Sequence, residues 1–265
     1  MENDKRKMFR LAASTYLNSA PLIWSFLHGF LDGSKRDTVD FTDAVPARCA
    51  QMLSQNEVDA ALVPVIEYQR IPGGALVPDV CVGSQKEVLS VVLVSKNAQL
   101  DDIRTVALDE SSRTSATLVK VIFREFLGRD AEWTTRTPNI EEMLERNDAA
   151  LIIGDPGMTF PRTGLKIWDM AELWRNYTGL GFVFAMWMVH EKIDVDFAGA
   201  RDEGVKRIDE IVEAYKNRIP MNLTKYLTEN IVYGVDESMQ RGLELYFELA
   251  HKHQLIERVK PLRYI

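Results

Sequence analysis

The chain has 265 residues, of which 46% are hydrophobic and 27% charged, an ordinary balance for a globular protein with a substantial core. Its formal net charge of −7 excludes the broad basic face that nucleic-acid binding needs, although a small anion can still be held locally. The two cysteines, Cys49 and Cys81, have no metal-type spacing, so neither a zinc site nor a disulfide framework is predicted. The N-terminus is charged and no apolar run reaches about 18 residues, which indicates a cytoplasmic protein without a membrane partner.

The first part of the chain alternates apolar runs with amphipathic segments. Apolar and β-branched runs predict strands at residues 9–13, 39–42, 60–65, 76–82 and 88–95. Helical spacing of apolar residues predicts helices at 21–31 and from Asp43 or Ala44 to Asn56. Pro46 falls in the first turn of the second helix, where its missing N–H costs least. These segments together predict an α/β fold.

The remainder continues this alternation and then becomes helical. Strands are predicted at residues 105–109, 149–154 and 182–189, and helices at 115–127, 141–146, 168–174, 203–218, 223–229 and 237–251. His28 lies in an apolar segment and is predicted to be a core residue. His251 and His253 lie in a charged terminal helix and are predicted to be a solvated surface pair.

The tetrapeptide Asp-Ala-Ala-Leu occurs twice, at residues 59–62 and 148–151, each time after an amphipathic segment. Two similar α/β halves would explain this repeat. Two long apolar runs, 88–95 and 182–189, can carry the chain from one half into the other and back. We therefore expect a discontinuous first lobe of residues 1–92 and 187–265, an inserted second lobe of residues 93–186, and a ligand cleft between them.

Two hydroxyl-rich turns precede helices at equivalent places of the repeat. One contains Ser14, Thr15, Tyr16, Asn18 and Ser19, and the other Ser111, Ser112, Arg113, Thr114 and Ser115. Such residues commonly serve only as helix caps. Two of these turns facing each other, one with an Arg that can grip a carboxylate, equally indicate an anion-binding cleft. Asp155, which follows the strand at 149–154, either points into this cleft or caps a turn. No nucleotide-binding, zinc-protease or serine-hydrolase motif is present.

Residues 14–22, Ser-Thr-Tyr-Leu-Asn-Ser-Ala-Pro-Leu, resemble the N-terminal signature of the chorismate dehydratases of the futalosine route to menaquinone. Further matches follow in order at residues 59–68, 90–95, 106–109, 112–115, 153–155 and 178–185. One departure is Gly181, where a proline is expected. The resemblance implies an α/β fold like that of type II periplasmic binding proteins, with two lobes and a ligand cleft.

The resemblance also implies a lyase that removes water from chorismate to give 3-[(1-carboxyvinyl)oxy]benzoate, with no metal or organic cofactor. For that substrate we expect Asn18 to be the catalytic group, hydrogen-bonded near the reacting carbons. An Asn is not a base at neutral pH, so the substrate's own enolpyruvyl carboxylate is the expected proton acceptor. Ser90 and the turn at 112–115 are expected to hold the two carboxylates. The predicted substrate-binding residues are Tyr16, Ser90, Ser112, Arg113, Thr114, Ser115 and Asp155.

Two other functions fit the same architecture. One is that of a sister family, which cyclises a futalosine derivative but begins with a Ser-Pro-Cys-Pro-Asn-type turn, so Tyr16-Leu17-Asn18 favours the dehydratase. The other is a non-catalytic binding protein for a small carboxylate, which the missing signal peptide disfavours. The sequence leaves the oligomeric state open and is compatible with a homodimer.

Overall fold

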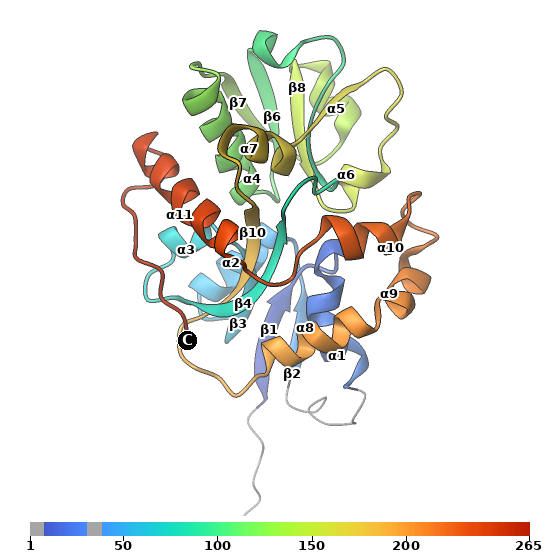
Figure 1. Cartoon of the computed structure of the whole chain (residues 1–265), viewed down its shortest axis with the longest axis vertical. Helices are drawn as coiled ribbons and strands as arrows, with labels where there is room; N and C mark the ends of the chain where they lie inside the picture. The colour runs from blue at the N-terminus through green and yellow to red at the C-terminus, as the bar shows by residue number, and fades with distance from the viewer. Residues whose placement is uncertain (1–7, 31–38) are drawn as a thin grey trace, which may run out of the picture.

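The computed structural model describes residues 8–30 and 39–265 and folds them into two α/β lobes (Figure 1). Each lobe is built on a five-stranded sheet. The strands of the first sheet lie in the order β2 (Val39–Asp43), β1 (Phe9–Ala13), β3 (Ala60–Pro64), β10 (Phe182–Val189) and β4 (Ala75–Ser84). Those of the second lie in the order β7 (Glu132–Arg136), β6 (Thr105–Asp109), β8 (Ala149–Ile153), β5 (Val91–Ser95) and β9 (Lys166–Asp169).

The two sheets repeat one pattern, which confirms the prediction of two similar α/β halves. In the first, β1 is parallel to β2 and β3, and β10 joins β3 in antiparallel fashion. In the second, β6 is parallel to β7 and β8, and β5 joins β8 in antiparallel fashion. The repeated Asp-Ala-Ala-Leu occupies equivalent positions: Asp59 accepts a 2.8 Å hydrogen bond from the backbone N–H of Arg10, and Asp148 one of 2.8 Å from that of Arg104.

Helices cover both sheets. Those of the first lobe and its C-terminal extension are α1 (Ala20–His28), α2 (Pro46–Ser54), α3 (Glu67–Arg70), α8 (Phe197–Lys206), α9 (Ile208–Tyr215), α10 (Leu223–Lys225), η5 (Tyr226–Asn230) and α11 (Glu237–Lys252). Those of the second lobe are η3 (Leu100–Asp102), α4 (Thr114–Val121), η4 (Ile122–Phe126), α5 (Ile140–Glu145), α6 (Pro156–Thr159) and α7 (Met170–Thr178). A short 3-10 turn, η1 (Leu17–Ser19), separates β1 from α1.

Several predicted elements need correction. The single helix predicted at 203–218 is two helices, α8 and α9, which meet at Arg207. The helix predicted at 168–174 begins two residues later, because residues up to Asp169 form β9 and the Asp169 carboxylate caps α7. The polar edge strand β7 was not predicted. His28 is exposed rather than in the core, and Leu31 lies outside the described residues.

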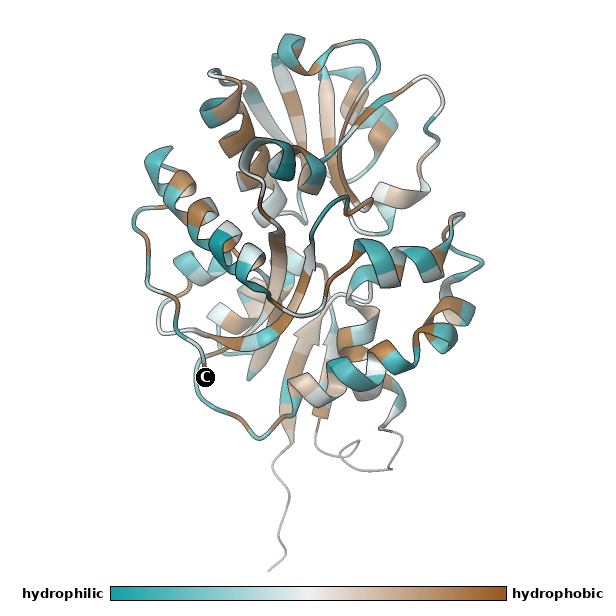
Figure 2. Ribbon diagram, in the orientation of Figure 1, coloured by the Kyte–Doolittle hydropathy of each residue, from teal (hydrophilic) through white to brown (hydrophobic). Residues whose placement is uncertain are grey.

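The central strands hold the apolar core. Every residue of β3 and of β8 is buried, because these strands lie inside their sheets with helices packed on them. Apolar residues accordingly concentrate along the strands, and the outer helices carry most of the polar surface (Figure 2). No helix among the described residues is long and apolar enough to span a membrane.

The chain crosses between the lobes twice, at positions slightly different from those predicted. β5 begins at Val91 and already pairs with β8 in the second sheet. β10 begins at Phe182 and pairs with β3 and β4 in the first sheet. Residues 91–92 were expected in the first lobe but pair within the second sheet. Residues 182–186 were expected in the second lobe but pair within the first sheet. The apolar runs are strands on either side of the crossings rather than the crossings themselves.

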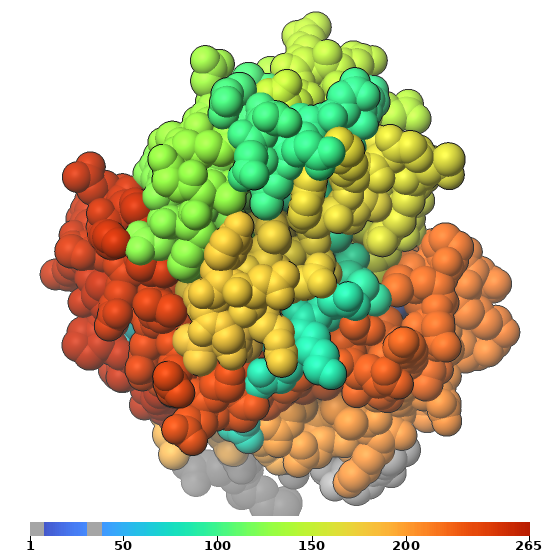
Figure 3. All heavy atoms as spheres, turned by 45° about the horizontal axis from the view of Figure 1, so that its top comes forward, coloured from blue at the N-terminus to red at the C-terminus, as the bar shows by residue number. Residues whose placement is uncertain are grey.

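The C-terminal helix α11 connects the two lobes. It packs against β10 of the first lobe and α4 of the second, and Figure 1 shows it lying beside both. In the space-filling view the green second lobe meets the red C-terminal segment directly (Figure 3). At its end, Lys252 and His253 contact the Glu125 carboxylate at 2.8 and 2.7 Å. His253 is therefore a half-buried partner of a carboxylate and not part of a solvated pair.

The Glu125 contacts predict a pH-dependent contribution to stability. The hydrogen bond with Lys252, and then that with His253, lowers the pKa of Glu125. A depressed carboxyl pKa adds stability above the unfolded-state pKa and loses it as the pH falls through the folded-state value. Because Lys252 is largely exposed, we expect Glu125→Gln to lower the free energy of unfolding by only about 1 kcal/mol at pH 7.

Urea unfolding of both proteins at pH 7 and pH 3.5 measures this difference, which should shrink at the lower pH. Glu213→Gln is the matched control, since within the described part of the chain Glu213 pairs with Lys216 on the surface of its own segment. A difference of the same size at both pH values would contradict the assignment.

Candidate active site

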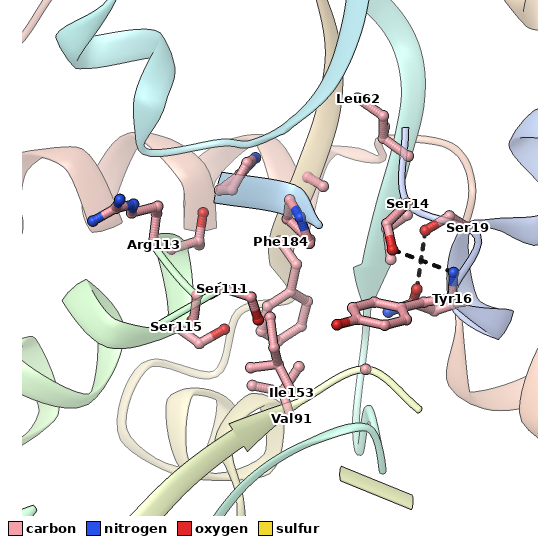
Figure 4. Close-up of a pocket in the computed structure, with 18 residues that line it drawn as sticks. Ser14, Tyr16, Ser19, Leu62, Val91, Ser111, Arg113, Ser115, Ile153 and Phe184 are labelled. Carbon is pink, nitrogen blue, oxygen red and sulfur yellow. Dashed lines mark hydrogen bonds between the residues drawn. The ribbon is translucent and has the colours of Figure 1, made fainter. Parts of the chain in front are cut away.

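A cavity opens between the two lobes where their hydroxyl-rich turns meet. η1 follows β1 in the first lobe and α4 follows β6 in the second, so both turns lie at the carboxyl ends of parallel strands. The cavity encloses about 540 Å³ between protein atoms, part of it open to solvent. Figure 4 draws its lining: Ser14, Tyr16, Asn18, Ser19, Pro46, Leu62, Pro64, Val82, Val91, Ser111, Ser112, Arg113, Thr114, Ser115, Ile153, Gly154, Phe184 and Ala185.

One wall of the cavity can bind an anion. Ser112 lines the cavity, and its buried hydroxyl has no hydrogen-bond partner within the described residues. Directly after it begins α4, whose first-turn N–H groups have no acceptor inside the helix. An unpartnered hydroxyl beside a helix N-terminus is an arrangement that accepts a carboxylate, because both groups donate and the helix dipole favours negative charge.

Arg113 does not extend this wall inward. Its side chain is exposed, and Figure 4 shows the guanidinium pointing away from Tyr16 and Phe184. Arg113 also lines a second, more open groove on that side of the molecule. In this closed arrangement its positive charge therefore lies at the edge of the cavity, where it can attract an anion without contacting its buried end.

Asn18 faces the cavity from the opposite lobe. Its Oδ1 accepts a 3.1 Å hydrogen bond from the Ser19 hydroxyl in the same turn. The amide NH2 can donate two hydrogen bonds to a ligand, and the carbonyl oxygen keeps one further lone pair. The site thus offers an electrophilic donor from the first lobe and an anion-binding turn from the second.

Tyr16 extends across the cleft between these two groups. Burial raises the pKa of its hydroxyl, and a hydrogen bond with Ser111 of the other lobe opposes that shift. Its ring packs on the backbone of Gly154, which has a φ of +66°. A Cβ built on Gly154 would lie 2.4 Å from the ring, so only glycine allows this contact.

A buried carboxylate supports the second turn from beneath. Asp109 accepts hydrogen bonds from the Ser111 hydroxyl at 2.6 Å, the Ser111 N–H at 2.9 Å and the Ile153 N–H at 3.2 Å. Burial raises the pKa of Asp109. Asp109 is not one of the cavity-lining residues, so it orders the turn and does not face a ligand.

The structure brings together six of the eight residues predicted for the site. Tyr16, Asn18, Ser112, Arg113, Thr114 and Ser115 all line the cavity. The hydroxyl of Thr114 is partly committed, because it accepts a 3.3 Å bond from the N–H of Ile66 in the other lobe. The roles of these six residues remain predictions.

Two predicted residues lie elsewhere. Ser90 is fully buried and its hydroxyl donates to the Val88 carbonyl at 3.3 Å, so it does not reach the cavity. The Asp155 carboxylate accepts a hydrogen bond from the Leu17 N–H and does not line the cavity either. The sequence interpretation did not identify the apolar wall that faces the polar turns, which is formed by Leu62, Pro64, Val82, Val91, Ile153, Phe184 and Ala185.

Among the residues that the structure describes, no Asp, Glu, His, Lys or Cys side chain lines the cavity. Across residues 8–30 and 39–265, no group of three or more His, Cys, Asp or Glu side chains is arranged to hold a metal ion. The groups that the protein offers to a ligand in the cavity are therefore hydroxyls, one amide, backbone N–H groups and a guanidinium at the cavity's edge.

Comparisons with known proteins identify the family. Residues 9–252 match a family model described as menaquinone biosynthesis. Chorismate dehydratase from Thermus thermophilus is 31% identical, covering 90% of this chain and 93% of that protein. Chorismate dehydratase from Campylobacter jejuni is 28% identical, covering 67% and 66%.

Solved structures share the fold. Protein AF1704 from Archaeoglobus fulgidus superposes with a TM-score of 0.76 at 18% identity, over 96% of this chain and all of that one. The periplasmic aliphatic sulphonate binding protein SsuA from Escherichia coli gives a TM-score of 0.67 at 12% identity, over 98% and 94%. At these identities the likeness establishes the two-lobed binding-protein fold alone.

The contact between Tyr16 and Gly154 predicts an unequal effect of two glycine substitutions. Gly154 and Gly128 lie in the second lobe with nearly the same positive φ, +66° and +64°, but a Cβ on Gly128 meets no atom within 4 Å. Gly128→Ala should cost about 1 kcal/mol for backbone strain alone. Gly154→Ala should cost at least about 1 kcal/mol more, because the buried aromatic ring must move. Urea unfolding measures both changes, and equal losses would contradict the packing described.

Proposed function

The chain belongs to the menaquinone biosynthesis family, and from this premise we propose that it is a lyase that dehydrates chorismate to 3-[(1-carboxyvinyl)oxy]benzoate. Its relatives from Thermus thermophilus and Campylobacter jejuni carry the name chorismate dehydratase. We also place the reaction in the futalosine route to menaquinone and the protein in the cytoplasm, as the sequence resemblance suggests.

The reaction does not require a strong acid or base from the enzyme. A proton leaves the ring carbon that bears the ether oxygen. The bond between the adjacent ring carbon and its hydroxyl breaks, and the hydroxyl departs as water after gaining a proton. The ring becomes aromatic, so the step is downhill. The enzyme then mainly has to orient the substrate and stabilise charge at the departing hydroxyl.

The observation that carries the proposal is a cavity that can bind a dianion yet contains no ionisable base. The unpartnered Ser112 hydroxyl and the α4 N-terminus suit one carboxylate of chorismate. The apolar wall around Phe184 suits the six-membered ring. Arg113 lies at the edge, where it can draw in a doubly negative substrate.

Because the cavity lining supplies no base, the substrate's enolpyruvyl carboxylate takes the ring proton in our proposal. This carboxylate is tethered to the reacting carbon through the ether oxygen, so its effective concentration is high. The Asn18 amide donates to the departing hydroxyl or to the carboxylate beside it. Ser115 and Tyr16 complete the polar lining that keeps the substrate in this orientation. Ser90, buried behind the wall, has no direct role in this arrangement.

Incubating the purified, metal-chelated protein with chorismate alone tests the proposal. Loss of chorismate absorbance together with a product that lacks one water establishes the dehydratase. Intact chorismate in a folded sample would contradict it and would favour the sister cyclase or a carboxylate-binding protein. A futalosine derivative, offered in a second incubation, distinguishes those two.

Asn18→Ala should lower kcat about 100-fold or more, because one preorganised donor at the developing charge is typically worth that much. Asn139→Ala is the matched control, since Asn139 caps the distant helix α5 and should alter stability but not kcat. Steady-state kinetics with chorismate measures both. Near-normal turnover by Asn18→Ala would show that the amide is not part of the catalytic machinery.

A further inference from the structure

Asp155 joins the two lobes at the turn that carries Asn18. It follows β8 in the second lobe, its side chain is only 13% exposed, and its Oδ1 accepts a 2.8 Å hydrogen bond from the Leu17 N–H of the first lobe. Leu17 is the first residue of η1 and the residue before Asn18. A single bond from the second lobe thus fixes the backbone next to the catalytic amide.

Neighbouring contacts make this bond part of a defined geometry. Gly154, the residue before Asp155, supports the Tyr16 ring, so consecutive residues of the second lobe hold consecutive residues of the first. On the other side, the Tyr215 hydroxyl donates to the Thr15 carbonyl at 2.7 Å. The turn at 15–17 is therefore held from two sides, by residues 154–155 of the second lobe and by Tyr215 of the first.

Charge argues against the simpler role of Asp155 as a substrate ligand. A carboxylate repels a dianion, and Asp155 lines a neighbouring groove, which shares Ser14 and Tyr16 with the cavity, rather than the cavity itself. Burial raises the pKa of Asp155, so the protein gains little from its charge. Arg218 is its nearest cation, at 3.7 Å and with a side chain 60% exposed, which makes a weak ion pair. The remaining role is that of a hydrogen-bond acceptor.

We propose that Asp155 is a positioning residue whose side-chain oxygen captures the Leu17 N–H on lobe closure and thereby sets Asn18 against the substrate. This inference rests on the proposed function of Asn18. The second lobe would then have two roles. It supplies the anion-binding turn, and through Asp155 it sets the position of Asn18 in the first lobe.

Three variants separate the acceptor from the charge. Asp155→Ala removes the acceptor and should lower kcat about 10- to 100-fold, since a displacement of about 1 Å costs that much. KM should change less than about threefold, because the anion-binding turn is untouched. Asp155→Asn keeps a carbonyl acceptor and should retain kcat within about threefold. Arg218→Gln removes the weak ion pair and the contact of the guanidinium with the Tyr215 ring but keeps the acceptor, so it should also retain kcat within about threefold.

Asp148→Ala is the matched control. Asp148 lies at the opposite end of β8 and accepts from the N–H groups of Arg104 and Thr105 within its own lobe, at 2.8 and 2.9 Å. Its loss should lower the thermal midpoint while leaving kcat unchanged in assays run below that midpoint. An Asp155→Asn variant as impaired as Asp155→Ala, or a full effect from Arg218→Gln, would overturn the proposal.

Amide hydrogen exchange tests the bond without reference to turnover. The Leu17 N–H should exchange faster in Asp155→Ala than in the native protein or in Asp155→Asn, and Asp148→Ala should leave it unchanged. Unchanged Leu17 exchange in Asp155→Ala would overturn the inference. If the native protein did not dehydrate chorismate, the proposed function would be wrong. The exchange rate of the Leu17 N–H would still show whether Asp155 holds that group.

Discussion

The closed contact between two turns on opposite lobes is the constraint on which the rest of this structure depends. Neither turn forms a site alone: one supplies Asn18 and the Tyr16 ring, and the other supplies Ser112 and the N-terminus of α4. Hydrogen bonds across the cleft, from Leu17 to Asp155 and from Ile66 to Thr114, fix the register between them. The duplicated α/β halves, the double crossing and the α11 bridge all serve to bring these two strand ends face to face.

Among the described residues, the cavity lining has no carboxylate, imidazole, amine or thiol side chain, and this gives the proposed chemistry its form. A dianionic substrate is held by dipoles and hydroxyls, which cost less to bury than charges and need no proton of their own. A reaction that ends in an aromatic ring tolerates such a site, because its driving force lies in the substrate. The solved structures that share this fold include a sulphonate-binding protein, and a shared fold does not by itself fix a function, so the function is argued from the groups in the two turns.

Local patterns in the sequence were enough to predict much of this. The buried strands β3 and β8 are continuous apolar runs, the Asp-Ala-Ala-Leu repeat predicted the duplicated sheets, and the polar turns predicted six cavity-lining residues. The errors have physical causes. β7 is a polar edge strand whose pattern resembles a loop, and the break at Arg207 falls within a segment whose apolar spacing is helical on both sides. Asp155 was misplaced because its partner, Leu17, is 138 residues away in the other lobe.

The central claim is that the protein positions chorismate while the substrate's own enolpyruvyl carboxylate removes the ring proton. The most direct test uses chorismate in which that carboxylate is replaced by a neutral primary amide. The account predicts that this analogue competes with chorismate for the cavity but is not dehydrated at a measurable rate. Dehydration of the amide at a rate near that of chorismate would show that the protein supplies the base and would contradict the account.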